Sequence, residues 1–170
     1  MVVFKSKRKA VDTVEKWLKE EEYEVSLVPD ENTDYNFMIV KGYMVLNVGF
    51  HKRSSDSLIV GGKIRFNPQE HSIIRYTTTK LELLYDIEII CVQLNLELVT
   101  TPVRENGEYS LEDIRLFKTL YFDGLTKQSF FDSLVGIFHC LRLIVAKFDI
   151  LGLGQNPLCQ DNLNLVLFSL

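Results

Sequence analysis

Apolar residues recur with two different periods through residue 66. In residues 5–22, Val11, Val14, Trp17 and Leu18 follow each other at three- and four-residue steps, the spacing of one apolar face of a helix. Four short strand-like runs come next, at residues 23–28, 35–41, 43–51 and 58–66. In the third run apolar and more polar side chains alternate, as in a strand with one buried face. Because the connections between the runs are short, we predict an antiparallel meander.

Two strong helix-start signals follow. Asn67-Pro68-Gln69-Glu70 combines a capping residue, a proline at the first helical position and a glutamate at the third, and helical spacing continues to about residue 98. Thr126 is the predicted N-cap of a further helix, with Leu125 and Phe130 at the two positions of a hydrophobic staple. An apolar stripe continues from Phe130 to Phe148, so this helix is expected to be largely buried.

Between these helices, residues 108–122 alternate as a strand, and residues 98–104 are expected to pair with it. We therefore predict an α+β fold with one antiparallel meander sheet, helices packed on one face, and the order α-β-β-β-β-α-β-β-α. Residues 1–150 form the predicted single domain, and residues 151–170 a C-terminal extension. We expect the extension's Leu163–Leu170 segment to pack on a sheet edge or a dimer interface, because an exposed apolar strand invites aggregation.

The composition and net charge limit the classes of partner that we expect. The net charge is −4 and the pI about 5.4, which argues against general nucleic-acid binding. The one basic cluster, at residues 5–9, is offset by four glutamates in residues 20–24, and solvated helix ends explain both. The longest apolar run, residues 134–148, is shorter than the roughly 20 residues of a membrane span and contains charges. The first residues reverse the order of a signal peptide, so we expect a cytoplasmic protein without a membrane partner.

The sequence contains no visible catalytic or metal-binding motif. The cysteines have no CxxC spacing and the histidines no metal-ligand spacing; these residues are Cys91, Cys140, Cys159, His51, His71 and His139. Neighbouring helical residues point about 100° apart, so His139 and Cys140 do not face each other, and Cys140 fits the core. The carboxylate pairs Glu112-Asp113 and Glu82/Asp86 are typical of solvated faces. We predict no catalytic, cofactor or metal residues.

Aromatic residues offer the best candidate for a binding surface. Aromatic side chains are frequent at protein interfaces, and this chain supplies Tyr35, Phe37, Tyr43, Phe50, Tyr76 and Tyr85. An extended peptide added to a sheet edge is one simple mode of recognition. Two alternatives stay open. One is a small-molecule-binding protein or enzyme with a site assembled from separate strands, using His51, His71 or Asp86, and the other is nucleic-acid contact through residues 5–9.

Residues 115–141 carry a resemblance to a known fold. This segment reads RLFKTLYFDGLTKQSFFDSLVGIFHCL: a strand ends in the short turn DGLT, and a helix opens with polar residues before an apolar stripe. This segment, together with the order of elements over residues 5–150, resembles the type III secretion chaperone-like fold. YbjN-like bacterial proteins also use that fold. The chain likewise resembles an uncharacterised archaeal family assigned to that fold. The resemblance implies a small, acidic, homodimeric protein that holds an extended segment of a client polypeptide and carries no catalytic residues.

Overall fold

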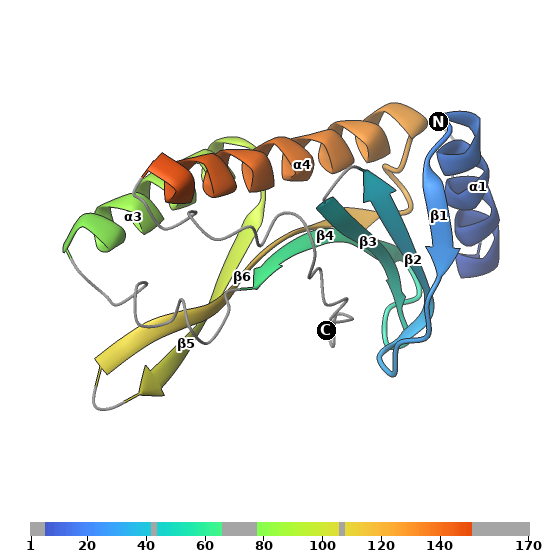
Figure 1. The fold of residues 1–170 in the computed structure, drawn as a ribbon. Helices are drawn as coiled ribbons and strands as arrows, with labels where there is room; N and C mark the ends of the chain where they lie inside the picture. Colours follow the sequence, from blue (N-terminus) through green and yellow to red (C-terminus); the bar gives the residue numbers. More distant parts are fainter. Residues whose placement is uncertain (1–5, 42–43, 66–77, 106–107, 151–170) are drawn as a thin grey trace. The chain divides into compact units, whose positions relative to one another are not determined.

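The structure, a computed structural model, describes residues 6–41, 44–65, 78–105 and 108–150 of the 170-residue chain (Figure 1). These residues form three helices and six strands in the predicted order. The helices are α1 (Lys7–Glu20), α3 (Thr78–Gln93) and α4 (Lys127–Ile150). The strands are β1 (Glu24–Leu27), β2 (Thr33–Lys41), β3 (Met44–His51), β4 (Ser57–Arg65), β5 (Glu97–Glu105) and β6 (Glu108–Tyr121). The predicted helix start at Asn67 and the 151–170 extension lie outside the described residues.

All six strands form one antiparallel sheet, in the order β1-β2-β3-β4-β6-β5. The α+β prediction with a single antiparallel sheet is therefore confirmed. The first four strands are a meander, as expected, but β6 lies between β4 and β5. The last two strands form a hairpin, in which Glu97 stands opposite Phe117 and Glu105 opposite Glu108. Strands β1 and β5 are left at the two edges of the sheet.

The described residues fall into two compact units. Of the described residues, the first unit contains those within 6–61 and 118–135, and the second unit contains those within 62–117 and 136–150. Strands β4 and β6 and helix α4 each contribute residues to both units. The prediction of one domain over residues 1–150 stays a prediction.

In the first unit, α1 ends at Glu20, the first of the four glutamates in residues 20–24. The helix starts after Ser6, whose side chain caps Lys9 N–H, and it buries the apolar stripe Ala10, Val11, Val14 and Leu18. Its C-terminus closes with two hydrogen bonds, from Tyr23 N–H to the Leu18 carbonyl and from Glu22 N–H to the Lys19 carbonyl, each 3.1 Å. This Schellman arrangement needs a left-handed residue, and Glu22 adopts it with φ 56°.

In the second unit, α3 ends earlier than predicted. Apolar spacing suggested a helix to about residue 98, but α3 stops at Gln93 and β5 begins at Glu97. Asn95 takes the left-handed conformation, with φ 53°, and Leu96 N–H bonds to the Cys91 carbonyl at 2.8 Å. Asparagine tolerates this conformation better than most residues, and it turns the chain before the buried Leu96.

Helix α4 begins as the sequence predicts. Thr126 Oγ1 accepts a hydrogen bond from Ser129 N–H at 3.0 Å, and Ser129 Oγ accepts one from Thr126 N–H at 2.9 Å. Leu125 and Phe130, the two staple positions, are both buried. The cap and the staple together set where α4 starts.

Candidate functional site

Two of the six aromatic residues proposed from sequence as a partner surface are buried in the core. Phe37 and Phe50 are buried and pack edge to face, with ring centroids 6.1 Å apart, so both contribute to the core of the first unit. Tyr35 is half-buried in that unit, whereas Tyr85 is 64% exposed on α3 of the second unit. Tyr43 and Tyr76 lie outside the described residues.

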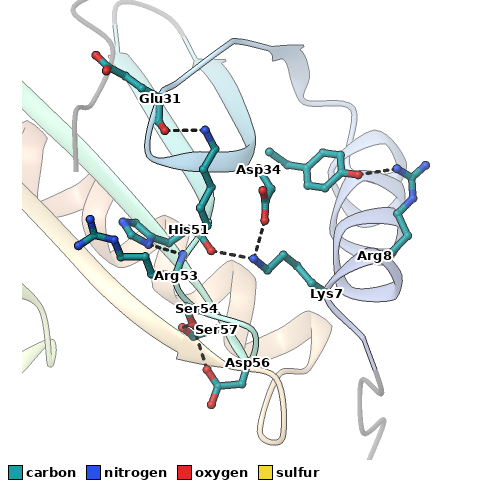
Figure 2. A network of polar contacts seen from close by, with 11 residues as sticks. Lys7, Arg8, Glu31, Asp34, His51, Arg53, Ser54, Asp56 and Ser57 are labelled. Carbon is teal, nitrogen blue, oxygen red and sulfur yellow. Dashed lines mark hydrogen bonds and ion pairs between the residues drawn. The ribbon is translucent and has the colours of Figure 1, made fainter.

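Part of the basic cluster at residues 5–9 bonds within the molecule. Figure 2 shows Lys7 and Arg8 reaching from α1 to the strands. Lys7 Nζ donates to Asp34 Oδ2 at 2.7 Å and to the His51 carbonyl at 2.8 Å, and Arg8 Nη1 donates to the Tyr35 hydroxyl at 2.7 Å. These contacts attach the start of α1 to β2 and β3, which leaves less of this basic cluster for a nucleic acid.

Two of the three residues named for an alternative catalytic site, His51 and Asp86, have structural partners. His51 Nδ1 accepts the Arg53 N–H at 3.1 Å in the turn after β3 (Figure 2). Asp86 accepts a hydrogen bond from Lys147 Nζ at 2.9 Å in the second unit, and His71 lies outside the described residues. Across the described ranges, no three His, Cys, Asp or Glu side chains gather in a way that could hold a metal ion.

The structure contradicts the expectation that Asp113 is solvated. We expected Glu112 and Asp113 to lie on a solvated face, but Asp113 is only 1% exposed. Its carboxylate accepts bonds from Lys63 Nζ at 2.9 Å, Arg115 Nε at 3.0 Å and Thr101 Oγ1 at 2.8 Å. Burial by itself would raise the pKa of Asp113, but these hydrogen bonds outweigh it and lower the pKa below its usual value.

The buried thiols form a pair that the sequence did not reveal. Cys140 is buried, as predicted, and His139 beside it is exposed. The Sγ atom of Cys140 lies 3.6 Å from that of Cys91 on α3. The neighbouring thiol and burial raise the pKa of Cys91, whereas the hydrogen bond with Cys91 lowers the pKa of Cys140. Both thiols are buried, which keeps reagents in solvent away from them.

A groove at the start of β1 is the best candidate site. Its cavity volume is about 640 Å³, within the range of about 300–1,000 Å³ that is usual for ligand pockets. It is lined by Glu21, Glu22, Tyr23, Glu24, Val40, Phe131 and Val135, and we call it the β1–α4 groove. All seven residues belong to the first unit. None of these side chains is fully buried, so the groove is open to solvent.

Four of the residues that line the β1–α4 groove are apolar or aromatic. Tyr23 and Phe131 stack with ring centroids 5.9 Å apart and an interplanar angle of 16°. Val135 follows Phe131 one helical turn later and is 40% exposed. Val40 also lines the groove, and it stands opposite Glu24 in the β1–β2 pair.

The remaining three lining residues are glutamates, Glu21, Glu22 and Glu24. Lys127 Nζ pairs with Glu21 at 2.7 Å and with Glu20 at 3.0 Å, and these hydrogen bonds raise the pKa of Lys127. Within the described residues, Glu22 and Glu24 have no such basic partner. In the sequence, the only signal for this acidic part of the groove is the run of glutamates in residues 20–24, and such a run is also typical of a solvated helix end.

Helix α4 is long and apolar enough to cross a membrane by length and composition. A core helix of a soluble protein passes the same test, so this is weak evidence. Its apolar stripe, including Phe130, Leu134 and Ile137, is buried inside the protein, and its opposite face exposes Asp132 and Arg142. This amphipathic distribution is typical of a helix packed on a core.

The fold defines an α+β protein built on one antiparallel sheet, and a solved structure shares it. The crystal structure of an uncharacterized protein from Methanothermobacter thermautotrophicus matches with a TM-score of 0.67 and 16% identity. The match covers 82% of this chain and 96% of that chain. At this identity the likeness shows the fold alone.

Residues 10–148 match the model of the family described as an uncharacterized conserved protein (DUF2299), and the chain belongs to this family. The search of curated proteins finds no match. The expected membership of an uncharacterised family is thus confirmed, and the structural neighbour is archaeal.

Proposed function

We propose that this protein is a non-catalytic adaptor or chaperone-like module that binds a segment of a client polypeptide in the β1–α4 groove. The observation that carries the proposal is the composition of the groove: the half-buried Tyr23–Phe131 ring pair and the exposed Val135 line it together with two glutamates, Glu22 and Glu24, that have no basic partner among the described residues. Such a combination suits a polypeptide, which brings apolar and charged side chains together.

The openness of the groove favours a polypeptide over a small molecule. Small-molecule sites bury about 70–90% of the ligand surface, and their walls are largely buried themselves. Here every lining side chain keeps part of its surface in solvent. A segment that passes along the groove needs no enclosure. The resemblance to secretion chaperones supports the same type of partner, and a homodimer in the cytoplasm is the form that it implies.

A pair of matched variants on α4 tests this proposal. Val135 is 40% exposed and lines the groove, whereas Leu143 is 38% exposed and does not line it. The tagged wild type, Val135→Gln and Leu143→Gln are used to capture partners from the native lysate, and each partner is quantified by mass spectrometry. We expect one polypeptide at near-equal amounts with the wild type and Leu143→Gln, reduced at least fivefold with Val135→Gln. Equal recovery by all three proteins, or recovery of no polypeptide, contradicts the proposal.

A further inference from the structure

The β1–α4 groove carries an unbalanced negative charge. Glu21 is neutralised by Lys127, which also pairs with Glu20. Glu22 and Glu24 line the same groove and, in the part of the chain that the structure describes, have no lysine, arginine or histidine partner. Both are exposed, so two carboxylates face an incoming ligand.

The aromatic residues of the groove also suit a cation. Lys127 Nζ already lies 5.9 Å from the centroid of the Phe131 ring, a cation–π distance. Tyr23, stacked on Phe131, comes between Glu22 and Glu24 in the chain. An ammonium or guanidinium group in the groove would therefore lie near two carboxylates and the Tyr23–Phe131 ring pair.

The fold sets the backbone positions of Glu22 and Glu24. Glu22 holds the left-handed position that closes α1, and its own N–H bonds to Lys19. Glu24 is the first residue of β1, paired with Val40. Neither residue sits on a loose chain end, so their separation is set by the fold before a ligand binds. Pre-organisation of this kind lowers the entropy that binding costs.

We infer that the β1–α4 groove selects a basic segment of its partner, with a lysine or arginine held between Glu22, Glu24 and Tyr23 and an apolar neighbour on Val135. This inference rests on the proposed function and specifies the class of client. Charge complementarity supports this: among the described residues Glu22 and Glu24 have no basic partner, and Val135 in the same groove offers an apolar contact to the flanking residue.

The test uses a fluorescein-labelled nine-residue peptide of alternating lysine and valine, with glutamate–valine and glutamine–valine peptides as controls. Binding is measured by anisotropy at low and high salt. Two matched variants remove one charge each: Glu24→Gln at the first residue of edge strand β1, and Glu97→Gln at the first residue of edge strand β5. Both side chains are exposed, so both variants are expected to fold, and both change the net charge equally.

We expect the lysine peptide to bind the wild type more tightly than either control peptide, and more weakly as salt rises. Glu24→Gln raises the Kd about threefold to fivefold, as loss of one partly exposed ion pair does, and Glu97→Gln leaves it unchanged. Equal Kd values for the two variants, or equal binding of the glutamate peptide, overturn the inference. Spermidine that competes at concentrations near the Kd of the peptide also overturns it, because the site then takes a small polycation.

The two proposals fail in different ways. If Val135→Gln loses a captured polypeptide while Glu24→Gln keeps it and the lysine peptide does not bind, the groove binds polypeptides but does not select basic ones. If neither the wild type nor any variant retains a polypeptide or the peptide probe, the proposed function itself is wrong.

Discussion

The buried carboxylate of Asp113 allows a quantitative prediction about stability. Asp113→Asn keeps the size of the side chain and one oxygen acceptor but removes the charge that Lys63 and Arg115 share. The amide also turns one N–H₂ group toward cationic donors that need an acceptor. The substitution therefore leaves two positive charges without a counter-charge in a poorly solvated place.

The size of the effect follows from the burial of each partner. Removing one member of a fully buried ion pair costs about 3–5 kcal/mol, and breaking an exposed pair costs about 0–1 kcal/mol. Asp113 is 1% exposed, but the side chains of Lys63 and Arg115 are 14% and 30% exposed, so water partly compensates them. We expect Asp113→Asn to lower the free energy of unfolding by about 3 kcal/mol, the lower end of the buried range.

Urea denaturation followed by circular dichroism measures this loss. With an m-value of about 2 kcal/mol/M, the midpoint falls by roughly 1.5 M at pH 7. The control is Glu112→Gln, one residue earlier, where the exposed Glu112 carboxylate pairs with Arg65 at 2.9 Å and the expected loss stays below about 1 kcal/mol. Equal losses for Asp113→Asn and Glu112→Gln would refute the reasoning, because the argument assigns the difference to burial.

The same residue predicts a dependence on pH. The folded-state pKa of Asp113 lies below its unfolded value of about 3.9, so its stabilising contribution is complete well above that pH and is lost as pH falls through the folded pKa. The difference in urea midpoint between the wild type and Asp113→Asn should therefore be largest near neutral pH and narrow below about pH 4. A difference that widens on acidification would contradict the assigned direction.

Three further predictions concern local features. Glu22→Gly should raise the free energy of unfolding by about 0.5–1 kcal/mol, because glycine adopts φ 56° with less strain, and a decrease in the urea midpoint would contradict this. Thr126→Ala should lower the free energy of unfolding by about 1 kcal/mol, because it removes the cap of α4, whereas Thr126→Ser should retain most of the stability that the cap contributes. In Cys159→Ser, the thiols of Cys91 and Cys140 should react with Ellman's reagent at pH 8 only after unfolding, and rapid native labelling would show that the pair is accessible.

Local signals explain why most of the fold could be predicted. The helix stripe of α1, the alternation in β3 and the capping of α4 by Thr126 each appear in a short window of sequence. The end of α3 was missed because Leu94 and Leu98 continue a helical spacing, while one residue, Asn95, turns the chain. A single left-handed residue ends a helix without disturbing the apolar period around it.

The site depends on contacts between distant parts of the chain, which periodicity does not report. Glu112 and Asp113 are equivalent in sequence, and the bonds from Lys63 on β4 and Thr101 on β5 distinguish them in the structure. The glutamates after α1 look like a solvated helix end until Lys127, 107 positions beyond Glu20, is brought against them. Pairing of strands and docking of α4 decide these contacts, and neither is visible in a local window.

The elements that build the β1–α4 groove are also those that end or begin helices. The left-handed turn at Glu22 stops α1 and places Tyr23 and Glu24 at the start of β1. The cap at Thr126 starts α4 and places Phe131 in its second turn, where it stacks on Tyr23. The proposed function therefore implies that stability and binding are coupled at this end of the first unit. A loosened cap should weaken binding in the groove even though Thr126 does not line it.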